Sequence, residues 1–230
     1  MKDFIKEELS GWKKSEVLWL LLACTIITCL SVYWGDSLMG IISATTGVAC
    51  VVCTGKGKLS AYIFGLINAV LYGIIALKAH YYGDAMLNLG YYSIMQFVGY
   101  FTWHKHMNAE THEVEKRRMN NKERMILVSV IALSTFLYGI ILRKLGGNLP
   151  YIDSFTTATS IIAMVISIRM YMEQWILWLA INSCSIIMWS YAFYNGNDSL
   201  STLLMWIVYF INSIISYLKW NKESKEISNV

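Results

Sequence analysis

The sequence has few charged residues and almost no proline. Charged side chains make up 15% of the 230 residues, proline occurs once, and hydrophobic residues make up 56%. An ordinary soluble domain carries about a quarter charged residues. Most of the charges lie in residues 1–16, 105–124 and 219–226, so the segments between them are almost entirely apolar. This shortage of charge excludes a soluble globular enzyme, a disordered protein and a nucleic-acid-binding protein.

The cysteines and histidines do not indicate a disulfide framework or a catalytic metal. All five cysteines lie in apolar runs, and Cys50 and Cys53 form an i, i+3 pair among valines, which favours packing. His104, His106 and His112 flank or lie in a charged loop; metal capture there is an alternative, but we favour a solvated loop. The sequence predicts no catalytic residue, no metal site and no cofactor.

Long apolar runs predict eight transmembrane helices. A helix needs about 20 residues to cross the hydrocarbon core. The runs are continuous rather than alternating, which argues against membrane β-strands, and Gly, Asn and Asp residues separate them. The predicted helices span residues 17–34, 37–54, 60–78, 85–104, 125–142, 150–170, 175–193 and 199–218.

The lysines and arginines predict the orientation of these helices. With eight spans, both termini and the loops at 55–59, 105–124 and 169–174 lie on one side of the membrane. That side holds 16 of the 19 Lys and Arg residues. The positive-inside rule therefore places both termini in the cytoplasm.

A weak internal repeat appears when the sequence is aligned with itself at an offset of 114 residues. The register needs no gap and aligns Asn68 with Asn182 and Asp84 with Asp198. Two three-helix units run parallel only if an odd number of spans joins them. We therefore expect an all-α polytopic membrane protein with two parallel three-helix repeats and one linking helix (3+1+3), plus one extra N-terminal helix. The divisions are residues 1–35 (N-terminus and extra helix), 36–105 (first repeat), 106–145 (cytoplasmic loop and linking helix), 146–220 (second repeat) and 221–230 (cytoplasmic tail).

Amide side chains at membrane depth are the candidate binding residues. Asn68 and Asn182 lie near the middle of their predicted helices, and an unpaired buried amide costs roughly 1–3 kcal/mol. Phe64 precedes Asn68 by one turn, and Trp178 precedes Asn182 in the same way. Further rings and amides lie seven residues from Asn182 or share a face of helix 85–104: Trp175, Trp189, Asn88, Tyr91, Tyr92 and Gln96. Any single amide could serve only to hydrogen-bond helices together, but the set predicts a polar cavity with aromatic walls.

Charge is missing at the same depth. The predicted spans contain no deep Lys or Arg, so no side chain would neutralise a desolvated phosphate. Asp153, near the start of its helix, is the one carboxylate within a span; it either contacts the ligand as a gate or caps the helix. Aromatic faces attract planar cations, and amides pair with carboxamides and hydroxyls. The cavity is therefore predicted to take an uncharged or cationic aromatic glycoside rather than a nucleotide.

Two segments resemble the PnuC family of bacterial nicotinamide riboside transporters. The first, in residues 44–75, contains YIFGLIN, which ends at Asn68. The second, in residues 153–185, contains a W-x-x-W-x-x-x-N pattern formed by Trp175, Trp178 and Asn182. The resemblance covers about residues 37–104 and 150–220, which is nearly the whole predicted seven-helix core.

This resemblance implies a SWEET-like 3+1+3 fold and import of nicotinamide riboside, an NAD precursor, by facilitated diffusion with alternating access across the bacterial inner membrane. It implies that the phosphorylated nucleotide is rejected and that a cytoplasmic riboside kinase consumes the imported substrate. The other partner is the lipid bilayer, with no nucleic acid; the oligomeric state, including a homo-oligomer, stays open. The implied site combines amides for the carboxamide and ribose with rings around the pyridinium: Asn68, Asn88, Gln96, Asn182, Phe64, Tyr91, Trp175, Trp178 and Trp189, with Asp153 as a further contact.

Two alternatives stay open. The nearest is a SWEET-like uniporter of the same architecture for a sugar or for another vitamin or nucleoside. A membrane-embedded enzyme is less favoured, because the sequence contains no nucleophile elbow and no metalloprotease motif.

Overall fold

The computed structural model describes residues 2–78, 85–108, 110–144, 150–194 and 200–228, and its regular elements there are helices. Helices occupy each of the eight segments that hydropathy predicts, which confirms the all-α class. The elements are α1 (Lys2–Leu9), α2 (Lys14–Tyr33), α3 (Leu38–Lys56), α4 (Ser60–Lys78), the π-helix η1 (Leu87–Tyr92), α6 (Ser93–Lys105), α7 (Asn121–Lys144), α8 (Pro150–Ile168), α9 (Gln174–Tyr194) and α10 (Leu200–Ser228).

Turn residues begin and end α3 where the sequence predicts a break. Ser37 caps its N-terminus, with Oγ accepting the N–H of Gly40 at 3.1 Å. Gly57 ends the helix in the left-handed region, at a φ of 86°, and its N–H donates to the carbonyls of Cys53 and Thr54. A side chain at this φ would strain the backbone, so glycine suits the turn.

Two helices differ from their predicted extent. The helix expected at 85–104 starts with a π-helical stretch, η1, in which the Asn88 carbonyl accepts from the Ser93 N–H and hydroxyl. Helix α10 continues to Ser228, well past the predicted end at residue 218. Hydropathy missed this extension because its outer part is charged, and Lys219 and Glu223 pair there with other elements.

Several described helices are suited to crossing a membrane. By length and composition, α2, α3, α4, α7 and α10 are each long and apolar enough to do so, which makes five such helices among the described residues. Helices α8 and α9 add shorter apolar stretches, Ser154–Ile168 and Gln174–Ile187. These helices are those of a multi-pass membrane protein.

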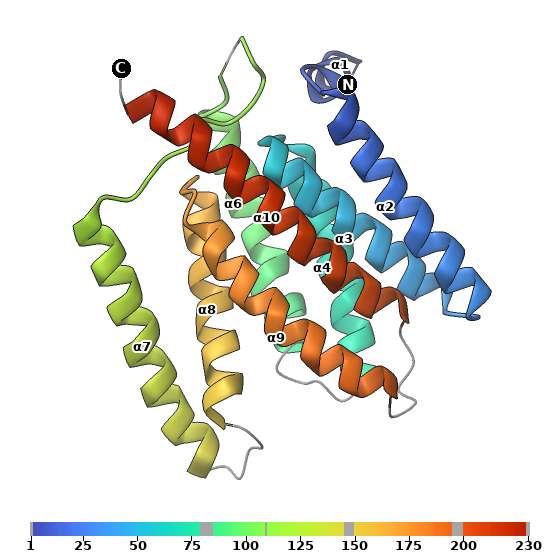
Figure 1. The fold of residues 1–230 in the computed structure, drawn as a ribbon, viewed down its shortest axis with the longest axis vertical. Helices are drawn as coiled ribbons and strands as arrows, with labels where there is room; N and C mark the ends of the chain where they lie inside the picture. The colour runs from blue at the N-terminus through green and yellow to red at the C-terminus, as the bar shows by residue number, and fades with distance from the viewer. Residues whose placement is uncertain (1, 79–84, 109, 145–149, 195–199, 229–230) are drawn as a thin grey trace.

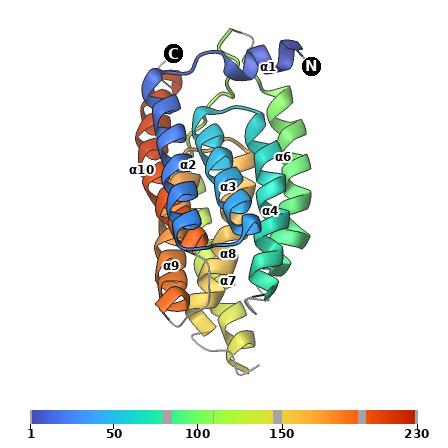
Figure 2. The same ribbon diagram turned by 90° about the vertical axis from the view of Figure 1, so that its right-hand side faces the viewer.

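Apart from the short α1, the helices lie broadly along one axis and form a bundle, and α1 and the end of α10 lie at the same end of the molecule (Figures 1 and 2). Helix α7 lies at one flank and packs against α8. Helix α2 lies at the opposite flank and packs against α3 and α10. Both flanking helices expose apolar side chains, including Leu18 and Leu21 on α2 and Leu133 and Phe136 on α7. Such surfaces suit contact with lipid.

Buried apolar residues form two clusters. One cluster includes Tyr72 and Met205. The other includes Tyr62 and Trp175, and it also contains Trp220 near the charged end of α10. Since Tyr72, Met205, Tyr62 and Trp175 also line one cavity, that cavity lies between the two clusters.

Candidate functional site

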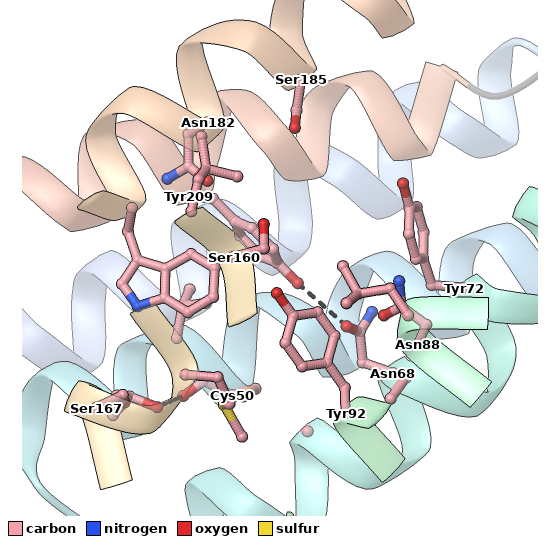
Figure 3. Close-up of a pocket in the computed structure, with 18 of the residues that line it drawn as sticks. Cys50, Asn68, Tyr72, Asn88, Tyr92, Ser160, Ser167, Asn182, Ser185 and Tyr209 are labelled. Carbon is pink, nitrogen blue, oxygen red and sulfur yellow. Dashed lines mark hydrogen bonds between the residues drawn. The ribbon is translucent and has the colours of Figure 1, made fainter. Parts of the chain in front are cut away.

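A cavity of about 170 Å³ lies between six helical segments (Figure 3). The described residues that line it come from α3, α4, η1 with α6, α8, α9 and α10. None of these lining residues belongs to α2 or α7. The described lining therefore comes from the helices that the predicted repeat pairs with each other, and neither flanking helix contributes to it.

Asn68 on α4 lines this cavity with its amide fully engaged. Its Nδ2 donates to the Ser43 carbonyl at 2.8 Å and lies 3.3 Å from the Ser43 hydroxyl. Its Oδ1 accepts from the Tyr209 hydroxyl at 3.4 Å (Figure 3). The side chain thus joins α4 to α3 and α10.

Asn182 on α9 lines the cavity with half of its amide unpaired. Its Nδ2 donates to the Ser213 hydroxyl at 3.0 Å. Its Oδ1 is buried and has no hydrogen-bond partner in the described part of the chain. The two asparagines that the repeat aligns therefore have different surroundings.

Asn88 and Gln96 bring two more amides to the cavity from η1 and α6, and both are buried. Gln96 lies directly against α4 at Gly65, where an added Cβ would fall 2.5 Å from Gln96 Oε1. A glycine at this position lets the amide side chain approach the backbone of the neighbouring helix.

Aromatic rings form part of the wall. Trp175 and Trp178 reach the cavity from α9, and Tyr92 reaches it from η1. The rings of Tyr92 and Trp178 have centroids 6.5 Å apart. The indole Nε1 of Trp175 is buried without a partner among the described residues. The wall therefore offers both ring faces and an unused hydrogen-bond donor.

Six of the predicted site residues come together here: Asn68, Asn88, Gln96, Asn182, Trp175 and Trp178. Phe64, Tyr91 and Trp189 are not among the described lining residues. On α4 the cavity faces Ala61, Gly65 and Asn68, and Phe64 lies beside that stripe. The binding roles of all nine stay predictions.

Tyr91 and Trp189 have other partners. The Tyr91 hydroxyl donates to the Ile161 carbonyl at 3.0 Å, which directs it toward α8. Trp189 Nε1 donates to the Tyr72 hydroxyl at 3.2 Å and packs behind this cavity residue. The tenth predicted residue, Asp153, belongs to α8, but its side chain lies outside the described part of the structure.

The site prediction missed the hydroxyl groups of α8. Thr156, Ser160 and Ser167 line the cavity at spacings of four and seven residues. This helical spacing is a readable signal of one polar face, yet Ser and Thr in a membrane helix are easily taken for packing residues. Two tyrosines also line the cavity. Tyr72 lies one helical turn after Asn68 on α4, and Tyr209 on α10 donates its hydroxyl to Asn68.

The described lining residues include no Lys, Arg, His, Asp or Glu. Charged side chains gather instead at the end of the molecule that holds α1. There Lys56 lies 2.8 Å from Glu113, and Lys116 lies 2.7 Å from Glu113 and 2.9 Å from Glu223. Burial alone would raise the pKa of the Glu113 carboxyl, but the surrounding ammonium groups, chiefly Lys116, outweigh burial and hold it below its ordinary value.

Another buried cation at this end has carbonyl partners. Lys58 is fully buried, and its ammonium donates to the carbonyls of Glu7 and His112, both at 2.9 Å. Burial lowers the pKa of Lys58, because the charged form loses its hydration. The loop histidines predicted as a metal alternative do not gather with other ligands, since no group of three His, Cys, Asp or Glu forms within the described residues.

Comparison with known proteins gives a consistent result. Residues 37–222 match the family described as nicotinamide mononucleotide transporter. The chain is 39% identical to the nicotinamide riboside transporter PnuC of Neisseria mucosa, over 97% of this chain and 87% of the relative. It is 35% identical to the protein of the same name from Haemophilus influenzae, over 94% of each. A crystal structure of the vitamin B3 transporter PnuC superposes with a TM-score of 0.88 at 36% identity, covering 97% of this chain and 98% of that one.

Proposed function

This chain belongs to the nicotinamide mononucleotide transporter family, and we propose that it imports nicotinamide riboside by facilitated diffusion with alternating access. The relatives named above are transporters, not enzymes. The observation that carries the proposal is the uncharged cavity lined by amides and aromatic rings. Nicotinamide riboside combines a planar cationic ring, a carboxamide and ribose hydroxyls, and each of these groups finds a matching side chain there.

The cavity also bears on which nicotinamide compound is carried. The family description names the mononucleotide, whereas the curated relatives are named for the riboside. A phosphate taken into a membrane cavity needs cationic partners, and the described lining residues supply none. This favours the riboside and rejection of the mononucleotide.

The 3+1+3 architecture with eight spans is part of the same proposal. Adding 114 to Ser60, the first residue of α4, gives Gln174, the first residue of α9. The same offset carries α3 onto α8 to within two residues at each end, and it carries the start of η1 to within one residue of the start of α10. All six of these segments line the cavity, which supports two repeats enclosing one site. The proposed divisions stay at residues 1–35, 36–105, 106–145, 146–220 and 221–230.

The orientation follows from charge. The end of the molecule that holds α1 and the end of α10 also holds residues 110–120 (Figures 1 and 2). Sixteen of the 19 cationic residues belong to the predicted loops and termini on that side. This supports a cytoplasmic location for both termini in the bacterial inner membrane.

Facilitated diffusion agrees with the side chains present. The described cavity lining contains no titratable carboxylate or histidine through which a proton could be coupled to transport. Net uptake would then depend on a cytoplasmic kinase that phosphorylates the riboside, because the product could not re-enter an uncharged cavity. Whether the carrier works as a monomer or a homo-oligomer does not affect this argument.

Binding and transport of purified protein test the proposal. We expect nicotinamide riboside to bind in isothermal titration calorimetry and to enter proteoliposomes with or without a proton or sodium gradient. We expect the mononucleotide to bind at least about 100-fold more weakly, because its phosphate would be desolvated without a cation. Equal binding of the two compounds, or uptake that stops when ion gradients are collapsed, would contradict the proposal.

A sugar uniporter of the same architecture is the second candidate. The hydroxyl groups of Thr156, Ser160 and Ser167 favour it, because hydroxyls suit a sugar. Competition of glucose or sucrose with labelled nicotinamide riboside separates the two. Displacement by the sugars at similar concentration would support the uniporter for sugars, and no displacement would support the riboside carrier.

A further inference from the structure

A chain of hydrogen bonds from Tyr209 through Ser213 to Asn182 determines which way the Asn182 amide faces. The Ser213 hydroxyl donates its single hydrogen to the Tyr209 carbonyl, with an oxygen–oxygen distance of 2.8 Å. Ser213 Oγ can then only accept at its contact with Asn182, 3.0 Å away. The NH2 group of Asn182 must therefore face Ser213, and the carbonyl Oδ1 must face away.

This carbonyl is free to accept a hydrogen bond from a ligand. Asn182 is only 2% exposed, its Oδ1 has no partner among the described residues, and the side chain lines the cavity beside Tyr209 (Figure 3). A buried carbonyl left unpaired is costly. Trp178, one helical turn before Asn182, lines the same cavity, so a ring stacked on Trp178 would bring a ring substituent close to Oδ1.

At the positions that the proposed repeat aligns with Asn182 and Ser213, the described part of the first unit lacks this arrangement. At the offset of 114 residues, Ser213 corresponds to Gly99, which carries no hydroxyl and where an added Cβ would fall 2.1 Å from the Tyr62 ring. Asn68 is held by Ser43 and Tyr209 instead, and both ends of its amide are occupied. Of these two asparagines, only Asn182 combines a fixed NH2 with an unpaired carbonyl.

We propose that Ser213 is a positioning residue for substrate selection, because it holds Asn182 Oδ1 ready to accept an N–H from a carboxamide on the bound ring. The inference rests on the proposed function, since the ligand is the riboside. A carboxylate at the same place has no hydrogen to donate, and its charge would face the Asn182 carbonyl. The described lining residues contain no cation to offset that charge. The arrangement selects nicotinamide riboside over nicotinic acid riboside.

The test compares the dissociation constants of these two ribosides by calorimetry on purified protein. Ser213→Ala frees the Asn182 amide to rotate, so we expect nicotinamide riboside to bind about 5–10-fold more weakly, as for one lost neutral hydrogen bond. Binding of nicotinic acid riboside should not weaken. The dissociation constant of nicotinic acid riboside divided by that of nicotinamide riboside should therefore fall by the same factor. Ser213→Thr keeps the hydroxyl and should keep the wild-type ratio.

Ser216→Ala is the matched control. It removes a buried hydroxyl from the same helix at a position outside the described cavity lining, so both constants should stay at the wild-type values. If Ser213→Ala does not yield folded protein, Ser213→Cys keeps the volume with only a weak hydrogen-bonding group and should lower the ratio in the same direction. An unchanged ratio in the Ala or Cys variant overturns the role of Ser213. A wild-type protein that fails to bind nicotinamide riboside overturns the proposed function instead.

Discussion

Asn68 and Asn182 show how neighbours decide what a polar residue does inside a membrane protein. Both lie in the middle of apolar helices and both line the cavity. Asn68 makes bonds through both ends of its amide, to Ser43 and to Tyr209, so its first role is to hold three helices together. The side-chain carbonyl of Asn182 has no hydrogen-bond partner among the described residues. At positions that the proposed repeat aligns, the same residue type is therefore paired through both ends of its amide in one case and keeps an unpaired carbonyl in the other.

This difference leads to a prediction for a pair of leucine substitutions. Asn182→Leu should abolish detectable binding of nicotinamide riboside while the protein stays folded and monodisperse. Asn68→Leu, in contrast, should lower the free energy of unfolding by roughly 1–3 kcal/mol, because it leaves the Ser43 carbonyl and the Tyr209 hydroxyl without their partner.

Calorimetry measures the binding, and thermal unfolding in detergent with size-exclusion chromatography measures the fold. If Asn182→Leu binds the riboside with near wild-type affinity, Asn182 only joins helices. If Asn68→Leu is as stable as Asn182→Leu, the assignment of Asn68 to packing is wrong.

The connecting segment at residues 110–120 contacts two turns that the proposed repeat makes equivalent. The Val114 N–H donates to the Gly57 carbonyl at 3.0 Å, in the turn between α3 and α4. The Arg117 N–H donates to the Met170 carbonyl at 2.8 Å, and the Arg117 carbonyl accepts from Met172 at 2.9 Å, in the turn between α8 and α9. One connecting segment thus braces both proposed repeats at the same end of the molecule.

Gly57 is the element-scale test of this brace. Its φ of 86° is left-handed, and an added Cβ would lie 3.2 Å from Val114 Cγ1 and 3.3 Å from the Val114 nitrogen. We expect Gly57→Ala to lower the free energy of unfolding by about 1–2 kcal/mol, the cost of a left-handed conformation with a side chain. Riboside affinity should be unchanged, because Gly57 does not line the cavity.

Gly90→Ala serves as its control, because an added Cβ there meets nothing within 4 Å. Thermal unfolding should separate the two variants. Equal stability of Gly57→Ala and wild type would show that the turn adjusts freely and that the brace is weak.

At the scale of the whole molecule, partly buried ion pairs connect elements that are far apart in the sequence. Glu16 on α2 pairs with Lys56 on α3 and with Lys219 on α10, each at 3.1 Å. Glu113 lies in the connecting segment, and it pairs with Lys56 on α3 and with Lys116 three residues further along the chain. Lys56 and Lys116 are buried, so removal of a carboxylate partner would leave an uncompensated buried charge.

Stability should therefore depend on acid pH through Glu113. Because its pKa is lowered in the folded protein, its contribution is fully present above the ordinary value of 4.5 and is lost as the pH falls from there through the folded value. We expect the melting temperature to fall over that window in the wild type. Glu113→Gln should be less stable at neutral pH and should lose part of this pH dependence.

Glu115→Gln, at an exposed position two residues away, is the matched control and should follow the wild-type profile. The measurement is thermal unfolding of detergent-purified protein at a series of pH values. A Glu113→Gln profile parallel to the wild-type profile would contradict the network.

Helix positions and the amide pair could be predicted from the sequence because both depend on local composition. Apolar runs bounded by turn residues predicted eight segments in which the structure has helices, and helical spacing placed Trp178 one turn from Asn182. The charged continuation of α10 escaped prediction, because a polar helix is stabilised here by partners on other elements such as Lys116. The cavity hydroxyls of α8 escaped because Ser and Thr carry little signal in an apolar helix.

The sequence by itself determined the all-α membrane class, the charge asymmetry and the paired asparagines, since hydropathy and spacing are properties of single segments. Only the tertiary structure decided which of these side chains meet. Trp178 reaches the cavity, whereas Trp189 is bonded to Tyr72, a residue 117 positions away. Asn68 is satisfied by Tyr209, 141 positions away, and Asn182 is left with a free carbonyl. Such contacts arise when distant helices pack, and no local pattern records them.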